Sequence, residues 1–296
     1  MNRRNFVRSG AASAAAVALG CARASAEPGT SASGALAPSP AQTYKHSVTR
    51  WPFSKFSVTE LARNAKAMGI VSVELLEPEE FALAKAEGMG CAIGYAKAGD
   101  PATRLTKGWN REAHHAWLLP GYEEGIRLAA AAGVPQVICF SGNREGLDDK
   151  SGLEASAAGL RQLMPAAERA GVTVIMELFN SKVNHPDYMA DSTRWGVDLV
   201  QKVGSARFKL LYDIYHMQIM EGDVIATIKR EHESIAHYHT AGVPGRHEID
   251  DSQELNYRGI VRALAEIGFT GYIAQEFIPL RDPMTSLREA VRICSV

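Results

Sequence analysis

Beyond Tyr44, short apolar runs alternate with longer stretches in which apolar residues recur every three or four positions. Short runs rich in Val, Ile and aromatic residues, bounded by Gly or polar residues, are typical of buried β-strands. A spacing of three to four is typical of a helix with one apolar face. The pattern therefore predicts an α/β fold in which strands and helices alternate along the chain.

The predicted strands and helices form repeating units. The strands are expected at residues 45–50, 71–76, 89–94, 136–142, 172–178, 208–213, 235–242 and 271–277. The helices are expected after Ser57, at 78–88, 122–133, 159–171, 193–204, 223–232 and 257–268, with a closing helix near the end. Eight strand and helix units over about 250 residues predict a single (β/α)8 barrel, or TIM barrel, at residues 44–296.

A (β/α)8 barrel carries its functional groups at the C-terminal ends of its strands. The last four predicted strands reach these ends near Glu177, Asp213, His239 and Glu276. A single acid after a strand is usually a helix cap or an ion-pair partner, but residues at four successive strand ends should converge on one rim. Three carboxylates and an imidazole in one mouth would repel one another and lose hydration unless a cation lay among them.

The residue types predict the cofactor. One divalent metal ion held by Glu177, Asp213, His239 and Glu276 would relieve the repulsion. Oxygen-rich ligation with one nitrogen suits Mg²⁺, Mn²⁺ or Co²⁺, and Zn²⁺ is also compatible. His237 lies two residues before His239 and so on the same face of its strand. We expect it to support a ligand rather than to be one.

Several other side chains are candidates for contact with a substrate. Arg246 follows the seventh predicted strand through a Pro-Gly turn, so its guanidinium could reach a carboxylate or a sugar hydroxyl. A surface ion pair with Glu248 is the alternative for this arginine. Lys182, beyond the fifth strand, is a candidate anion contact. Trp51 and Trp109 could form an apolar wall against the carbon face of a sugar.

The first 26 residues are predicted to be a targeting segment rather than part of the fold. They open with a twin-arginine pair, Arg3 and Arg4, continue with an alanine-rich run, and end in small residues that suit cleavage before Glu27. This predicts export to the periplasm by the twin-arginine machinery, which carries folded, cofactor-loaded proteins. The apolar run is too short to span a bilayer. A lipoprotein anchored at Cys21 and a disordered tail with two chance arginines are the alternatives.

Residues 27–43 are rich in Ser, Ala, Pro and Gly and predict a flexible linker. Without the targeting segment the chain carries 28 basic and 33 acidic side chains, because four of its 32 Lys and Arg residues lie in that segment. The resulting formal charge of −5 argues against a nucleic-acid partner, which requires a basic surface. A small-molecule substrate, a sugar or a keto acid, is the better expectation.

Motifs along almost the whole predicted barrel resemble a known family. They read SVTRWPF, ELLEPEEF, KGWNRE, VICFSGNREG, MELFNSKVNH, FKLLYDIYHMQIMEGD, HYHTAGVPGRHEIDD, ELNY and QEFIP. On these motifs, residues 44 to 287 resemble the xylose isomerase-like TIM barrel superfamily of sugar phosphate isomerases and epimerases, and most closely its bacterial hydroxypyruvate isomerases. The resemblance implies a metal held by Glu177, Asp213, His239 and Glu276, with substrate contacts from His216 and Arg246.

The implied activity is an aldose–ketose isomerisation, such as that of hydroxypyruvate to tartronate semialdehyde. A reaction of this kind removes a proton from the carbon next to a carbonyl, passes through an enediolate and returns a proton elsewhere. Glu177 and Glu276, three strands apart on the rim, are predicted to act as base and acid beside a charge-stabilising metal. His216, one helical turn beyond Asp213, is predicted to donate a hydrogen bond to a substrate oxygen.

Other activities are compatible with the same residues. Hydroxypyruvate isomerases often have glutamine where this chain has His239, whereas ketose 3-epimerases have histidine there. An exported ketose 3-epimerase, or an epimerase or lyase of 3-keto-glycosides, is therefore the main alternative. An apurinic endonuclease would need more histidine ligands and a basic face, and a non-catalytic sugar-binding barrel would not need four charged residues. The resemblance also allows a homodimer.

Overall fold

The computed structural model describes residues 41–296. The predicted targeting segment, Cys21 and most of the predicted linker lie outside these residues. Within them the chain forms eight parallel strands: β1 Lys45–Thr49, β2 Ser72–Glu74, β3 Ile93–Gly94, β4 Gln136–Cys139, β5 Thr173–Glu177, β6 Phe208–Asp213, β7 Ile235–Thr240 and β8 Tyr272–Gln275. Each lies within the predicted range, although most are shorter than predicted.

The strands form one sheet in the order β2-β1-β8-β7-β6-β5-β4-β3. Its two edge strands are neighbours as well, because isolated parallel bridges join Ser72 to Gly90 and Leu76 to Gly94. The sheet therefore curls into a nearly closed barrel with no long exposed edge. The predicted (β/α)8 fold is confirmed.

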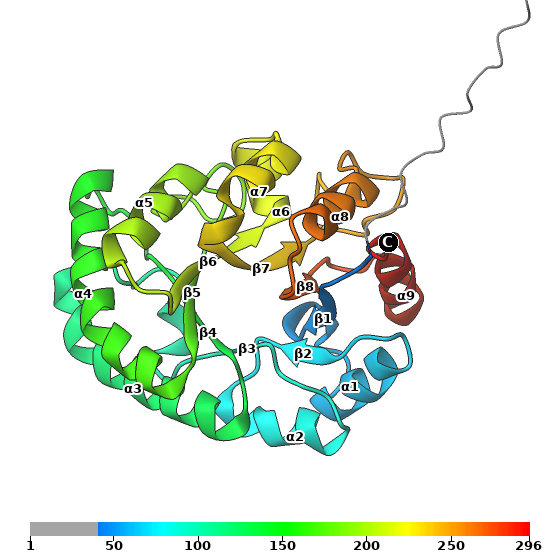
Figure 1. Ribbon diagram of the computed structural model, residues 1–296, viewed down its shortest axis with the longest axis horizontal. Helices are drawn as coiled ribbons and strands as arrows, with labels where there is room; N and C mark the ends of the chain where they lie inside the picture. The colour runs from blue at the N-terminus through cyan, green and yellow to red at the C-terminus, as the bar shows by residue number, and fades with distance from the viewer. Residues whose placement is uncertain (1–40) are drawn as a thin grey trace, which may run out of the picture. The chain divides into compact units, whose positions relative to one another are not determined.

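Helices form a ring outside the strands (Figure 1). In the described residues they are α1 Val58–Lys66, α2 Phe81–Ala86, α3 Glu112–Ala132, α4 Asp149–Ala170, α5 Thr193–Val203, α6 Ile214–Met220, α7 Val224–Glu231, α8 Tyr257–Glu266 and α9 Pro283–Ile293. Short 3-10 helices occupy Trp51–Phe53, Pro78–Glu80, Pro101–Thr103 and His232–Ser234. Local signals set several of the boundaries. Ser57 and Glu60, for example, form a capping box that begins α1.

Three helices differ from the prediction. The helix expected at 159–171 begins ten residues earlier, at Asp149, where the side chain of Asp148 caps α4. The helix expected at 122–133 begins at Glu112, because α3 continues through Pro120 and packs along α4. A proline in the sequence is normally a sign that a helix stops or kinks. Helix α6 was not predicted, and it begins directly after β6 because the side chain of Asp213 caps it. This capping aspartate is also one of the predicted metal ligands.

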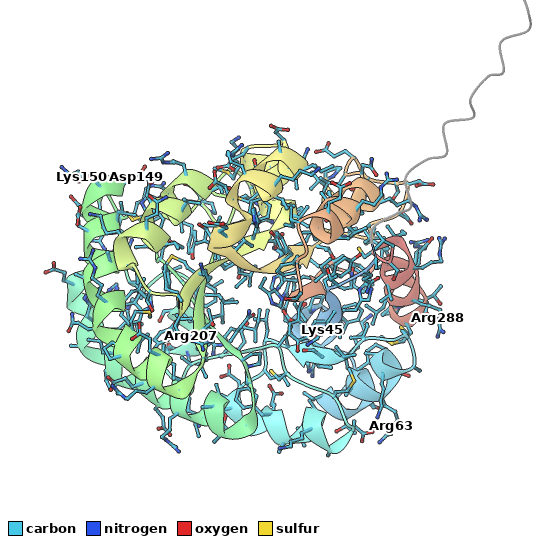
Figure 2. The ribbon with its side chains drawn as sticks, in the orientation of Figure 1. Lys45, Arg63, Asp149, Lys150, Arg207 and Arg288 are labelled. Carbon is cyan, nitrogen blue, oxygen red and sulfur yellow. The ribbon has the colours of Figure 1, made fainter. Side chains whose placement is uncertain are left out.

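Side chains alternate between the two faces of each strand, so every second residue points into the barrel. In β7, His237 and His239 share one face, while Tyr238 packs on Phe269 with ring centroids 4.9 Å apart. Figure 2 shows side chains filling the space inside the strands and charged residues such as Arg288 at the outer edge of the helix ring. No helix in residues 41–296 is long and apolar enough to cross a membrane.

Candidate active site

Four side chains from successive strands meet at the carboxyl end of the barrel. Glu177 ends β5, Asp213 ends β6, His239 lies near the end of β7 and Glu276 directly follows β8. Parallel strands in a barrel bring their C-terminal ends to one mouth. All four residues are buried, and one possible ligand atom from each lies within 4.8 Å of the others. The structure therefore brings together the four residues that were predicted to converge.

Two glutamates flank the imidazole of His239. Its Nδ1 atom lies 2.8 Å from Oε2 of Glu276 and 3.4 Å from Oε1 of Glu177. Oε1 of Glu177 is buried and has no hydrogen-bond partner among the described residues. Leaving a buried carboxylate oxygen without a partner is costly, so this atom is suited to hold a cation or to accept a proton.

The two carboxylate oxygens of Asp213 have different roles, because one caps a helix and the other faces the cluster. Its Oδ1 accepts hydrogen bonds from the backbone N–H groups of Tyr215 at 2.8 Å and His216 at 3.2 Å, which caps α6. Its Oδ2 lies 3.1 Å from the guanidinium of Arg246. The cap fixes the carboxylate while leaving one oxygen directed into the cluster.

Arg246 is the main counter-charge to the carboxylates in the described structure. Its Nη2 donates to Asp213 and, at 2.5 Å, to Oε2 of Glu276. Its Nη1 lies 2.7 Å from Nε2 of His216. The side chain also passes beside the ring of Trp51, with 5.3 Å between the guanidinium carbon and the ring centroid. A planar group with several donors can hold two carboxylates in fixed positions.

The environments of the carboxylates give them different proton affinities. Burial, and then the charge of Glu276, raise the pKa of Glu177 to about 7. Burial likewise raises the pKa of Asp213 to about 6, against the opposing charge of Arg246. Burial would also raise the pKa of Glu276, but His239 and Arg246 outweigh it and hold that pKa well below its usual value. Within the cluster as it stands, Glu276 is therefore the most acidic carboxyl group and Glu177 the least acidic.

His216 was predicted to contact the substrate, but the structure does not place it on the cavity wall. It is fully buried, its Nδ1 accepts the backbone N–H of Asn180 at 3.1 Å, and its Nε2 faces Arg246. Burial and the charge of Arg246 lower the pKa of His216 well below its usual value, so the ring is neutral. His216 contacts Arg246, and Arg246 lines the cavity.

A cavity of about 390 Å³ opens directly above the cluster. Glu177, Glu276 and Arg246 contribute to its lining. The remaining wall is mostly apolar and includes the aromatic residues Trp51, Tyr95, Phe140 and Phe179. A mainly apolar cavity with a few convergent polar groups is the usual form of a small-molecule site.

The two predicted tryptophans have different positions. Trp51 lines the cavity, and its indole Nε1 donates to Oε1 of Glu276 at 2.7 Å. Trp109 is fully buried and packs against His115 and Tyr122 of α3, with ring centroids 5.6 and 5.1 Å away. The prediction that Trp109 forms part of the substrate wall is therefore wrong, because this residue is part of the packing between its loop and α3.

Lys182 contacts the end of a helix and not the cavity. Its ammonium group donates to the carbonyl oxygens of Ile219 at 3.2 Å and Met220 at 3.0 Å, at the C-terminal end of α6. The last carbonyls of a helix lack partners within the helix and attract a cation. Lys182 does not line the cavity, so its predicted role as an anion contact is wrong for this arrangement.

The sequence prediction missed some residues of the site. Glu74, the last residue of β2, is fully buried and contacts His239. The strand-end argument that identified the other acids would have identified Glu74 too, but the predicted strand ran past it to residue 76. His185 also lines the cavity and stacks on Phe179, with centroids 4.1 Å apart, and no local sequence signal marks it.

Comparison with known proteins agrees with this architecture. The sequence profile of the xylose isomerase-like TIM barrel family matches residues 36–294. The 2-oxo-tetronate isomerase of Cupriavidus necator is 32% identical over 230 residues, covering 73% of this chain and 85% of that protein. The hydroxypyruvate isomerase of Escherichia coli is 27% identical over 182 residues, 57% of this chain and 69% of that protein. The structure of an AP endonuclease, family 2, from Brucella melitensis superposes with a TM-score of 0.73 at 26% identity, covering 84% of this chain and 96% of that one.

Proposed function

The chain belongs to the xylose isomerase-like TIM barrel family, and we propose that it is a metal-dependent intramolecular isomerase of a small keto sugar or keto acid. The observation that carries the proposal is the group Glu177, Asp213, His239 and Glu276 below a cavity of small-molecule size. The names of its isomerase relatives support the reaction class.

The four residues fit one divalent cation. They offer three carboxylates and one imidazole whose ligand atoms lie within 4.8 Å of one another, and Oε1 of Glu177 has no hydrogen-bond partner in the described structure. Hard carboxylate ligands with one nitrogen favour Mg²⁺, Mn²⁺ or Co²⁺, with Zn²⁺ also compatible. Such an ion, when bound, supplies Lewis-acid stabilisation of negative charge on substrate oxygens.

Proton transfer is assigned to the two glutamates. Glu177 lines the cavity beside His239, where its carboxylate is placed to take and to return a proton. Glu276 also lines the cavity, and His239 and Arg246 hold its pKa below the usual value. One carboxylate removes the proton from the hydroxyl-bearing carbon next to the substrate carbonyl, and the pair returns a proton to the former carbonyl carbon. The hydroxyl proton moves at the same time to the former carbonyl oxygen. Trp51 fixes the orientation of Glu276 through its indole N–H.

Hydroxypyruvate, converted to tartronate semialdehyde, is the first candidate substrate because of the E. coli relative named for that activity. A four-carbon 2-oxo acid is equally in keeping with the C. necator relative. Both are carboxylates and would need a cationic partner. In the present structure Arg246 neutralises the charges of Asp213 and Glu276. If a metal neutralised these two carboxylates instead, Arg246 could bind the carboxylate of the substrate.

One observation favours a second candidate, a 3-epimerase or a 3-keto-glycoside epimerase or lyase. Arg246 is the only Lys or Arg side chain among the described residues that line the cavity, and it already pairs with two carboxylates. The aromatic walls and the volume of about 390 Å³ suit a neutral sugar with apolar faces better than a three-carbon acid. A nuclease is disfavoured by the formal charge of −5, and a purely binding protein by the buried acidic cluster.

A turnover screen in deuterated water tests the proposal. Metal-loaded protein is incubated with hydroxypyruvate, ketohexoses and 3-keto-glycosides, and the products are analysed by NMR and mass spectrometry. An isomerase by proton transfer gives a product with solvent deuterium at the reacting carbon, and an epimerase gives the inverted centre with deuterium. Product with no solvent deuterium, once internal return of the same proton is excluded, would indicate hydride migration and reject the glutamate pair.

A further inference from the structure

The imidazole of His239 is held from both sides by carboxylates. Its Nδ1 faces Glu276 and Glu177, as described above, and its Nε2 lies 2.9 Å from Oε1 of Glu74 on β2. Glu74 and His239 are both fully buried in the barrel interior. Glu74 is not part of the four-residue cluster and does not line the cavity.

We infer that Glu74 is a positioning residue that holds the proton of His239 on Nε2 and so presents Nδ1 to the cluster as the ligand atom. This inference rests on the proposed metal site. A neutral imidazole has one protonated nitrogen and one nitrogen with a lone pair. A carboxylate at 2.9 Å from Nε2 stabilises the tautomer with the proton there, which leaves the lone pair on Nδ1. Carboxylates that accept the second N–H of a ligating histidine fix its ring and increase its basicity.

His237 is a second neighbour of Glu74. The same Oε1 lies 3.0 Å from Nε2 of His237, one layer further from the mouth, although this nitrogen makes no hydrogen bond among the described residues. His237 is in turn fixed by Gln136, whose Oε1 lies 3.0 Å from its Nδ1 while the Gln136 amide N–H₂ donates to the carbonyl oxygen of Ala236 at 3.2 Å. A chain of buried polar groups thus connects β4, β7 and β2 and ends at His239.

Burial makes a purely packing role for Glu74 unfavourable. Placing an ionisable side chain in a barrel interior costs free energy unless its charge is used, and an apolar side chain would pack the same space without that cost. The side chain of Glu74 accepts no hydrogen bond from a backbone group in the described structure. Its Oε1 contacts the two histidines, and its Oε2 has no partner among the described residues. Its charge therefore acts on His239 and His237 and not on the fold of its own strand.

Glu74, His237 and His239 could instead form a second cation site, because their ligand atoms also lie within 4.8 Å of one another. Two ions on one imidazole would require the ring to lose both of its protons. That is far less favourable than keeping a proton on Nε2 beside a carboxylate. The geometry therefore favours a single ion and a positioning role for Glu74.

The ring nitrogens of His239 can be observed directly. Protein labelled with ¹⁵N in histidine is loaded with Mg²⁺ or Zn²⁺, and long-range ¹H–¹⁵N NMR spectra are recorded, with His239→Gln used to assign the signal. We expect a protonated Nε2, a shift of Nδ1 on metal addition, and one ion per chain by elemental analysis. Ligation through Nε2, or more than one ion per chain, would overturn the inference. This measurement needs no variant of Glu74 to fold and no knowledge of the substrate.

Replacing Glu74 provides the second test. Glu74→Gln keeps the size and one acceptor, Glu74→Leu removes the acceptor, and Gln275→Leu is the control because Gln275 is equally buried but faces Thr240 on the other side of β7 and β8. Metal affinity, measured by competition with a chelator, should fall by about 10–100-fold in Glu74→Leu, by less in Glu74→Gln, and stay unchanged in the control. Wild-type affinity in Glu74→Leu would overturn the inference. Because affinity is read without turnover, failure of the proposed reaction would not affect this test.

Discussion

At the scale of single residues, the cluster gives two chemically identical glutamates opposite properties. Glu177 has an oxygen without a hydrogen-bond partner and a pKa raised to about 7. Glu276 accepts hydrogen bonds from the N–H groups of Trp51 and Arg246, and its pKa is lowered. Neither property follows from the residue type. Each follows from which neighbours the barrel places next to the carboxylate.

The first prediction separates these two glutamates. Glu177→Gln and Glu276→Gln should each lower turnover by about 10²–10⁴-fold, because each removes a proton carrier and a possible metal ligand. Their partial reactions should differ. The variant that keeps the proton-abstracting carboxylate should still exchange substrate hydrogen with deuterated water, and the other should not. Equal exchange in both variants would contradict a division of roles between the two residues.

The second prediction concerns metal occupancy. Asp213→Asn should lose metal while remaining folded, because an asparagine oxygen can still accept the N–H groups that cap α6 but carries no charge for the cation. His239→Ala should lose metal as well. His237→Ala should lose less, since His237 is not one of the four predicted ligands and lies beside Glu74 and His239. Elemental analysis of the purified proteins measures this. Full occupancy in both Asp213→Asn and His239→Ala would reject the ligand assignment.

At the scale of elements, the rule that acids at strand ends converge was sufficient to find four of the buried polar residues. It succeeded because the parallel strands of a barrel all have their C-terminal ends at the same end of the barrel. It failed at Glu74, because the strand predicted for β2 ran to residue 76 whereas the observed strand ends at Glu74. The position of Trp109 could not be predicted, since it depends on how its loop packs on α3.

The third prediction belongs to β1, where His46 is buried beside the C-terminal Ser295, 3.1 Å away. Burial lowers the pKa of His46 to about 4. The unfolded chain therefore takes up a proton between about pH 6.5 and pH 4 that the folded protein does not, so the free energy of unfolding decreases as the pH falls through this window. This effect of His46 lowers the free energy of unfolding by up to about 3 kcal/mol.

Urea denaturation of the wild type and of His46→Gln at pH 7 and at pH 4 measures this effect. Other histidines with a lowered pKa, such as the half-buried His185, lower the free energy of unfolding equally in both proteins over the same pH range. The difference between the two proteins therefore isolates His46. We expect the variant to lose less stability on acidification. An equal loss in both would show that His46 is protonated in the folded state or reaches solvent.

At the scale of the whole molecule, the barrel places an apolar-walled cavity over a charged floor, and the formal charge of −5 for the chain without its predicted targeting segment adds no basic surface for a polyanion. This arrangement suits a small substrate that enters from solvent and reacts at the floor. The compartment in which it meets that substrate depends on the first 26 residues, which lie outside the described structure.

The fourth prediction is export by the twin-arginine route. The lysine replacements Arg3→Lys and Arg4→Lys, made together, keep the charge but remove the arginine pair, so the precursor should remain in the cytoplasm. Arg8→Lys is the matched control, because it changes an arginine of the same segment outside the pair and should be exported normally. Cell fractionation with immunoblotting measures the distribution. Periplasmic accumulation of the double variant would rule out this route.

The mature N-terminus distinguishes the two forms of an exported protein. Cleavage after the small residues at Ala24 and Ala26 gives a soluble chain that begins at Glu27, whereas lipoprotein processing gives a chain that begins at a lipidated Cys21. We expect mass spectrometry of the periplasmic protein to show Glu27 first.

A metal bound before transport should be retained during export, because the four ligands are buried and a folded protein crosses the membrane without opening the barrel. Metal found in the protein from the cytoplasm and from the periplasm alike would agree with loading before export, and metal found only in the periplasmic protein would contradict it.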